Sequence, residues 1–235
     1  MKHTDKKKVV FGTGWGYGEP MVAVDDSWKV YCVRGPLTAK SMGVPEDLAI
    51  TDAALLISGF VSRDDQVDAG CGIAYVPHWS HASFGWKEVC ERCGVKFIDP
   101  RCEVEVVLDG IRKSSLVICE AMHGAIVADA LGIPWLAVRS SDSISTLKWR
   151  DWTLAIEVEL QMHRLPALWG VPHSPTYFQR SRQEFKMKLA TYCMRRLIRQ
   201  ARPVLSDRSL ASELHDRLHE KLLVFTTDVR KGLWD

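Results

Sequence analysis

The segment from Leu116 to Ala125 holds a histidine and a carboxylate where a strand would turn into a helix. Glu120 and His123 follow a short apolar run, and a longer apolar stretch comes after them. An imidazole gives or takes a proton near neutral pH, and a carboxylate can orient it or act as a partner base. Gly124 beside the histidine would let a ligand approach the backbone. A structural histidine is the alternative, because lone histidines are more often structural than catalytic.

A second segment, Val33–Thr38, combines an arginine with the start of a helix. Arg34 and Gly35 precede Pro36, a residue that suits the first turn of a helix. A guanidinium fork beside free backbone N–H groups and the positive end of a helix dipole suits phosphate or carboxylate. The pattern equally allows Arg34 to cap a neighbouring strand.

Two further segments carry histidines or glycines. His78, Trp79 and His81 stand together, but a metal ion would need more ligands, so we expect contacts with a sugar and no metal. In the loop Gly12–Gly18, Gly14 belongs to an alternating glycine pattern without the Gly-x-Gly-x-x-Gly spacing. No Lys-Ser or Lys-Thr follows for a P-loop, so dinucleotide binding has only weak support.

Strand-like and helix-like segments alternate from Val9 to Val138. The predicted strands are Val9–Phe11, Val30–Val33, Gly72–Pro77, Val95–Ile98, Leu116–Cys119 and Pro134–Val138. The predicted helices are Pro36–Gly43, Phe84–Cys93, Glu103–Lys113 and Met122–Leu131. Such alternation is typical of a parallel sheet with helices on both faces, where functional residues gather at the carboxyl ends of the strands. That rule places on one edge the segments Gly12–Gly18, Arg34–Pro36, His78–His81 and Glu120–His123.

The pattern divides the chain into two strand–helix units, residues 1–66 and 67–165, and a helical tail, residues 166–235. The polar stretch Ser62–Gly70 is the candidate linker. A long helix is predicted from Ser181 to Ala201. Its predicted inner face carries, at roughly helical spacing, Phe185, Leu189, Tyr192 and Leu197. Between Arg180 and Arg202 eight basic residues stand against one acidic residue, which favours a solvated face or a patch for acidic lipid headgroups.

The composition of the 235 residues is that of an ordinary globular chain. It is 46% hydrophobic and 26% charged with a net charge of +2, which excludes a disordered, collagen-like or coiled-coil chain and argues against a general nucleic-acid binder. No apolar run reaches the roughly 18 residues of a membrane-spanning helix, and the charged start is unlike a signal peptide. Seven cysteines are an odd number, and the pair Cys90 and Cys93 has no second pair to complete a zinc site. We therefore expect reduced cysteines and a cytoplasmic location.

Together these segments resemble the polysaccharide pyruvyl transferase family, most closely the branch that adds pyruvate ketals to succinoglycan-type exopolysaccharides. The most specific matches are Arg34–Thr38 and His123–Asp129. In order along the chain, the matching segments are Val9–Gly18, Tyr31–Ala39, Ile50–Leu56, Tyr75–Trp79, Ser115–Val138 and Lys148–Trp152. Family members usually have a further N-terminal strand and a Gly-Asp turn, and many have an arginine where this chain has Ala121.

The resemblance implies an α/β fold of two Rossmann-like lobes like those of GT-B glycosyltransferases, with a shortened N-terminal lobe and a helical C-terminal tail. It implies transfer of pyruvate from phosphoenolpyruvate to two hydroxyls of a sugar or lipid-linked oligosaccharide, with release of phosphate and without a further cofactor. The implied catalytic residues are His123, Glu120 and Asp52. The implied substrate-binding residues are Arg34, Gly35, Gly14, His78, Trp79, Gly124 and Lys148. The helix Arg180–Arg202 would then meet the inner membrane face, where lipid-linked acceptors reside; no nucleic acid partner is expected.

Two alternatives stay open. A nucleotide-sugar glycosyltransferase of the GT-B type would need a uracil-stacking and a ribose-binding residue late in the second lobe, and we identify no such pair. The other alternative is a truncated, non-catalytic member of the same pathway.

Overall fold

The computed structural model describes residues 7–15, 24–61, 72–168 and 177–233. The predicted linker Ser62–Gly70 and the later part of the Gly12–Gly18 loop lie outside the described residues. The chain forms two compact units, each assembled from separated segments. Unit 1 comprises Met1–Phe60, Ser145–Leu160 and Ser206–Asp235, and unit 2 comprises Val61–Ile144 and Gln161–Leu205. The predicted domain boundaries instead cut the chain into three consecutive pieces, and they stay a prediction.

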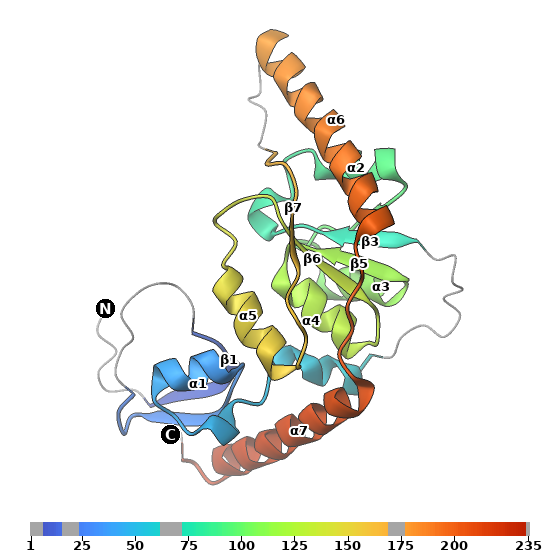
Figure 1. Cartoon of the computed structure of the whole chain (residues 1–235). Helices are drawn as coiled ribbons and strands as arrows, with labels where there is room; N and C mark the ends of the chain where they lie inside the picture. The colour runs from blue at the N-terminus through green and yellow to red at the C-terminus, as the bar shows by residue number, and fades with distance from the viewer. Residues whose placement is uncertain (1–6, 16–23, 62–71, 169–176, 234–235) are drawn as a thin grey trace. The chain divides into compact units, whose positions relative to one another are not determined.

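Unit 2 is built around a five-stranded sheet in which all neighbouring strands are parallel (Figure 1). The strands are β3 (Ile73–Val76), β4 (Lys96–Phe97), β5 (Leu116–Cys119), β6 (Trp135–Arg139) and β7 (Met162–Arg164). Their order across the sheet is β4-β3-β5-β6-β7. Counted within the unit, this is the 2-1-3-4-5 order of doubly wound, flavodoxin-like sheets.

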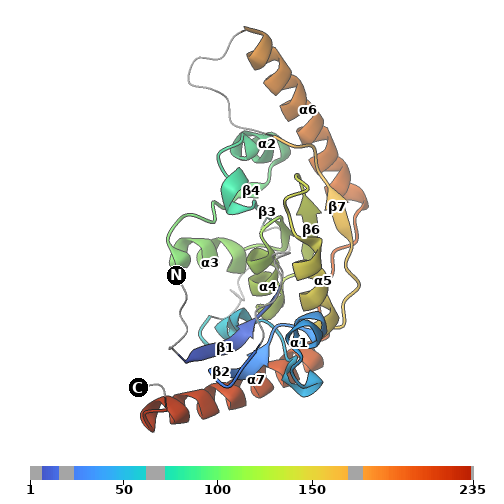
Figure 2. The same ribbon diagram turned by 90° about the vertical axis from the view of Figure 1, so that its left-hand side faces the viewer.

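Helices cover both faces of this sheet (Figures 1 and 2). They are α2 (Trp86–Cys93), α3 (Val104–Arg112), α4 (Met122–Ala130) and α6 (Tyr177–Gln200). On one face Tyr75, Ile118 and Leu136 of adjacent strands share a buried cluster with residues of α2 and α6. On the other face α4 lies so close that a Cβ on Gly124 would meet the side chain of Val76 at 3.2 Å. The prediction of a parallel sheet with helices on both faces is confirmed for this unit.

The long helix α6 faces the core with a different side from the predicted one. Its buried side chains include Met187, Ala190, Thr191, Met194 and Leu197. The predicted inner face is wrong for Phe185, Leu189 and Tyr192, whose side chains are 68%, 42% and 62% exposed. Both sets recur at helical spacing, and periodicity alone does not decide which of two apolar stripes packs on the sheet.

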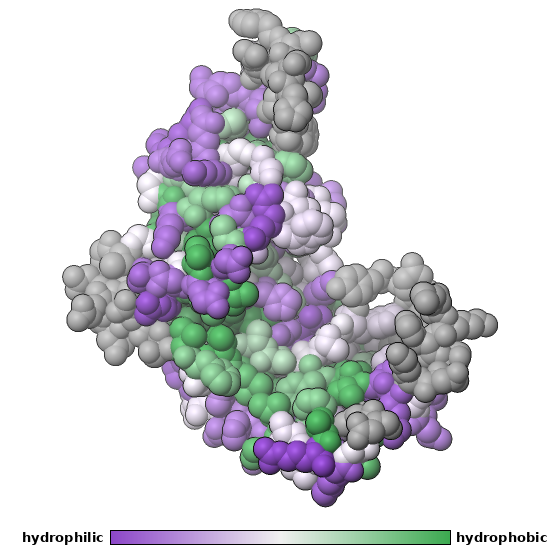
Figure 3. Space-filling view, turned by 180° about the vertical axis from the view of Figure 1, so that it is seen from behind, coloured by the Kyte–Doolittle hydropathy of each residue, from purple (hydrophilic) through white to green (hydrophobic). Residues whose placement is uncertain are grey.

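Charged residues join α2 to α6 within unit 2. Arg92 donates from Nη1 and Nη2 to the two carboxylate oxygens of Glu184, at 3.1 Å each, and from Nη2 to Glu88 at 2.6 Å. Seen from behind, the surface around these two helices at the top of the view is mainly hydrophilic (Figure 3).

In the described part of the chain, no helix has the length and apolarity to cross a membrane.

The cysteines of the described residues are free thiols. Cys90 and Cys93 lie at the end of α2, and burial is the largest cause that raises the pKa of both thiols. A raised thiol pKa lowers the thiolate fraction at neutral pH, so this pair lacks the reactivity of a redox motif.

Unit 1 holds a separate two-stranded parallel sheet of β1 (Lys8–Thr13) and β2 (Trp28–Val33). Pro36 begins α1 (Pro36–Met42), and Gly43 ends it at a left-handed φ of 63°, as the sequence predicts. The other elements of unit 1 are the 3-10 helices η1 (Glu46–Leu48) and η2 (Ala53–Gly59) and the α-helices α5 (Thr146–Ala155) and α7 (Arg208–Arg230). From α7, Phe225 packs edge-on against Tyr31 of β2, with ring centroids 5.3 Å apart.

The prediction of one common edge for all four functional segments is wrong. The segments after β1 and β2 belong to unit 1, and those after β3 and β5 belong to unit 2. The described strands form two separate sheets, so the four segments lie at two edges. The carboxyl-end rule still applies within each sheet.

Candidate functional site

The winding direction of the sheet in unit 2 reverses at the neighbouring strands β3 and β5. From β3 the chain passes to β4 on one side and then to β5 on the other side of β3. The loops after β3 and β5 therefore diverge, and open α/β sheets bind ligands in the crevice at such a switch point. His78 and Trp79 follow β3, and Glu120 and His123 follow β5. The prediction that these two segments share an edge is confirmed.

Glu120 is the centre of a buried hydrogen-bonded cluster at this switch point. The residue is 1% exposed, and its Oε1 accepts from the backbone N–H of Ser140 at 2.7 Å and from the Ser140 hydroxyl at 2.6 Å. Its Oε2 accepts from the backbone N–H of His78 at 3.1 Å and lies 2.9 Å from Nδ1 of His81. Because Ser140 follows β6, one carboxylate ties together the loops after three adjacent strands.

The contact with Glu120 sets the tautomer of His81. An ionised carboxylate only accepts hydrogen bonds, so Nδ1 carries the hydrogen and Nε2 keeps the lone pair in the neutral ring. Among the described residues no hydrogen bond uses Nε2 of His81. The ring is buried and stacks on Phe84, with centroids 5.7 Å apart. A histidine oriented by a buried carboxylate is suited to act as a general base.

His123 is exposed in the first turn of α4. Of the four contacts of Glu120 given above, one is with a histidine, and that histidine is His81; the pairing of Glu120 with His123 stays a prediction. Gly124 is buried, and a Cβ there would meet Val76 at 3.2 Å and the Cys119 sulfur at 3.4 Å. The geometry thus explains this glycine by the packing of α4 on the sheet.

The segment after β3 places an aromatic surface beside the cluster. His78 caps the 3-10 helix η3 (Trp79–His81), and its Nδ1 lies 2.8 Å from the Ser80 hydroxyl. Trp79 is 65% exposed, with its ring 5.8 Å from the His78 ring. An exposed indole next to hydrogen-bonding groups is suited to an amphipathic ligand such as a sugar.

In unit 1, Arg34 stands between two carboxylates. The residue is 5% exposed; its Nη1 lies 3.8 Å from Asp52 Oδ2, and its Nε lies 3.5 Å from Asp151 Oδ2. Asp52 also accepts from the backbone N–H of Ala54 at 3.0 Å and so caps η2. These contacts balance the charge of Arg34 internally. The roles of Arg34 as an anion contact and of Asp52 in catalysis stay predictions.

Asp151 occupies the N-terminus of α1, where the sequence suggests an anion. Its Oδ1 accepts from the backbone N–H groups of Leu37 at 2.9 Å and Thr38 at 3.1 Å, and its Oδ2 accepts from the Thr38 hydroxyl at 2.6 Å. Gly35 is required beside it, because a Cβ would lie 2.1 Å from the Asp151 carbonyl oxygen. Gly14 is similarly constrained, since a Cβ would lie 1.9 Å from Arg34 Nη2.

The predicted site residues therefore fall into two groups. Unit 2 holds His78, Trp79, Glu120, His123 and Gly124, and unit 1 holds Gly14, Arg34, Gly35, Asp52 and Lys148. Lys148 is half-buried on α5. The sequence interpretation missed Ser140 and Asp151 as partners of these groups. Ser140 lies two residues after the predicted strand Pro134–Val138, so the carboxyl-end rule gives a signal for it. No spacing rule points from Asp151 to α1.

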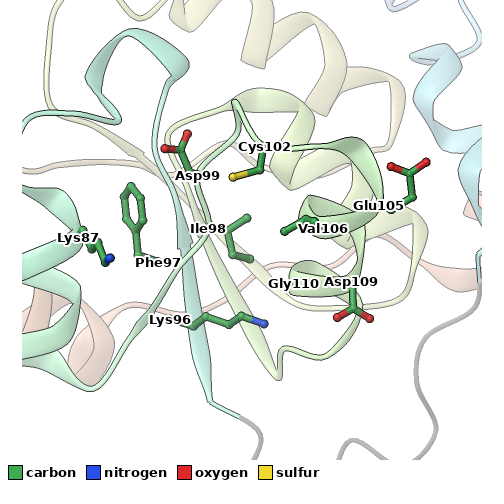
Figure 4. A pocket seen from close by; sticks show the side chains of 10 residues that line it. All are labelled: Lys87, Lys96, Phe97, Ile98, Asp99, Cys102, Glu105, Val106, Asp109 and Gly110. Atoms are coloured by element: carbon green, nitrogen blue, oxygen red, sulfur yellow. The ribbon is translucent and has the colours of Figure 1, made fainter.

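A cavity of about 590 Å³ lies elsewhere in unit 2, beside the edge strand β4 and helix α3 (Figure 4). It is lined by Lys87, Lys96, Phe97, Ile98, Asp99, Cys102, Glu105, Val106, Asp109 and Gly110. None of these residues belongs to the Glu120 cluster, and β3 separates β4 from β5. Its lining mixes apolar side chains with charges of both signs, and this mixture does not identify a ligand.

Within the described ranges, no three His, Cys, Asp or Glu residues are grouped to hold a metal ion.

The fold and the cluster define unit 2 as an α/β protein of the Rossmann-like class with a buried Glu120–His81 pair at its switch point. The chain is similar to the succinoglycan biosynthesis protein ExoV of Rhizobium meliloti (strain 1021), with 39% identity over 161 residues. That match covers 68% of this chain and 51% of the relative, so the chain spans about half the length of the curated protein it matches. No protein-family model and no solved structure matches the chain.

Proposed function

We propose that this chain is a polysaccharide pyruvyl transferase of exopolysaccharide synthesis, which transfers pyruvate from phosphoenolpyruvate to a sugar as a ketal. The observation that carries the proposal is the 39% identity to a succinoglycan biosynthesis protein. The two specific motifs of the sequence, Arg34–Thr38 and His123–Asp129, carry the resemblance to the polysaccharide pyruvyl transferase family. The acid–base cluster at the switch point supports it as a place where such chemistry is feasible.

The proposed reaction needs one acid and one base. Protonation of the methylene carbon of phosphoenolpyruvate makes its neighbouring carbon electrophilic, and one sugar hydroxyl adds there while losing its proton. Phosphate then leaves with the electrons of its C–O bond, and a second hydroxyl adds and loses its proton, which closes the ketal. Positioned acids and bases typically contribute about 10²–10⁴-fold to such steps.

The proposal assigns these steps to groups around the switch point. His123, exposed at the start of α4, is the proton donor to the methylene carbon. His81 is the base for a sugar hydroxyl, because Glu120 holds its Nδ1–H and leaves Nε2 for a second partner. Trp79 and His78 contact the acceptor sugar. Arg34 and Lys148 belong to unit 1, and the family resemblance assigns to them the contacts with the donor's negative charges.

The test is incubation of the purified chain with phosphoenolpyruvate and a panel of lipid-linked and nitrophenyl sugars. Released phosphate is measured, and mass spectrometry looks for the ketal on the sugar. The proposal expects phosphate release that depends on both substrates. Transfer of a sugar from a nucleotide sugar, tested in parallel, would replace the proposal with a glycosyltransferase. If the chain neither turns over any donor nor binds phosphoenolpyruvate, the alternative of a non-catalytic member of the pathway replaces the proposal.

A further inference from the structure

The face of α6 turned away from the sheet carries a row of exposed aromatic residues. Phe178, Phe185 and Tyr192 are 77%, 68% and 62% exposed, and their spacing of seven residues puts them on one side of the helix. Leu189, 42% exposed, lies on the same side. Large apolar side chains gathered on one exposed side of a helix indicate a binding face.

Basic side chains surround this row. The exposed members are Arg182, Lys188, Arg195, Arg196 and Arg199. The single acidic residue of α6, Glu184, is held by Arg92 of α2 through two contacts of 3.1 Å, so its charge is balanced inside unit 2. The pKa of Lys186 is lowered, first by burial and then by the charge of the neighbouring Arg182.

The position of α6 within unit 2 leaves this face accessible. In both ribbon views its first turns extend beyond α2 and beyond the sheet (Figures 1 and 2). Among the described side chains of α6, those buried against the unit lie on the side of Met187, Ala190 and Met194.

We propose that this outer face of α6 docks on the surface of an anionic lipid bilayer. The aromatic rings would enter the headgroup region, while the arginine and lysine heads bind lipid phosphates and lay their aliphatic stems along the apolar boundary. A nucleic acid also attracts cations, but a convex helix offers no groove to follow its backbone. A second copy of the same face would bring like charges together. The proposal is independent of the reaction proposed above.

The test is flotation of the whole chain with vesicles made of phosphatidylcholine alone or of equal parts phosphatidylcholine and phosphatidylglycerol. We expect binding to the anionic vesicles that weakens as salt increases. A basic residue near an anionic surface contributes about a fivefold gain in partitioning, so Arg196→Gln with Arg199→Gln should lower the partition coefficient about 25-fold. Phe185→Ser with Tyr192→Ser should also lower it, with less dependence on salt.

Matched controls lie on α7 and at its C-cap Lys231, outside the proposed face. Arg230→Gln with Lys231→Gln removes the same number of charges, and Leu223→Ser with Val224→Ser removes exposed apolar side chains. Circular dichroism confirms that each variant is folded. Absence of the wild-type chain from anionic vesicles at low salt would overturn the proposal, as would equal losses in the α7 variants. The proposal would also be overturned if the chain bound a labelled oligonucleotide and not the vesicles. The same holds if the chain self-associated through Phe185 and Tyr192 and did not bind vesicles.

Discussion

Glu120 combines almost complete burial with contacts to three different loops. A glutamine has the same shape, but its amide nitrogen would face donors where a carboxylate oxygen now accepts. Glu120→Gln should therefore lower the free energy of unfolding by about 1.5–3 kcal/mol, the cost of losing hydrogen bonds to a buried charged group. Urea unfolding measures it, with the exposed Glu103→Gln as control. Equal stability of both variants would contradict the conclusion that the hydrogen bonds of Glu120 stabilise unit 2.

Arg34 offers a second test at the scale of one residue. Arg34→Met would leave Asp52 and Asp151 without their shared cation, and breaking a buried ion pair by removing one partner costs about 3–5 kcal/mol. We expect a loss of stability of that size in denaturant unfolding. Unchanged stability would show that the two carboxylates do not depend on Arg34.

In Arg34→Lys, a weaker affinity for phosphoenolpyruvate measured by calorimetry would support the predicted anion contact.

His163 makes unit 2 sensitive to acid. Its Nε2 is buried without a hydrogen-bond partner, and burial lowers the pKa of the ring in the folded chain. The unfolded ring titrates near pH 6.5, so the unfolded state binds more protons between the two pKa values. Stability is fully present above about pH 6.5 and falls as the pH drops through the folded pKa.

Replacing His163 should therefore flatten this pH dependence. We expect His163→Leu to lose less unfolding free energy on acidification than the wild type, as followed by urea titrations across a pH series. The exposed His219→Leu is the control. An acid response of His163→Leu identical to that of the wild type would contradict this explanation.

At the scale of elements, the start of α1 depends on a close backbone approach. A Cβ on Gly35 would overlap the Asp151 carbonyl and also displace the carboxylate that caps α1. Gly35→Ala should cost at least the roughly 1–3 kcal/mol of ordinary overpacking. Gly72→Ala adds the same methyl group in open space and should change stability by less than about 0.5 kcal/mol. Similar melting temperatures for the two variants would contradict the close approach of Gly35 to the Asp151 carbonyl.

The elements themselves were predictable where local signals were strong. Pro36 and Gly43 mark the two ends of α1, and the apolar run Leu116–Cys119 is a buried strand. The three residues of β7 are too few to show an alternation, so no pattern marks that strand. The orientation of α6 was not predictable either, because two apolar stripes compete and only tertiary packing selects one.

At the scale of the whole molecule, the two units are interleaved along the chain, and local patterns do not reveal such long-range pairing. Asp151 caps a helix that contains Thr38, 113 residues earlier. The site is more predictable within the parallel sheet, since the carboxyl-end rule brings together the segments of Glu120 and His78. The rule does not say which histidine the carboxylate holds, and the structure gives that place to His81.

The measurement that tests this account most directly compares turnover and thermal stability of His123→Asn on the same preparation. His123 is exposed, so the variant should keep the wild-type melting temperature. As the proposed proton donor, its loss should lower phosphate release from phosphoenolpyruvate at least about a hundredfold. The exposed His219→Asn, on α7, is the matched control and should keep full activity. A His123→Asn variant that melts earlier yet releases phosphate at the wild-type rate would contradict the account.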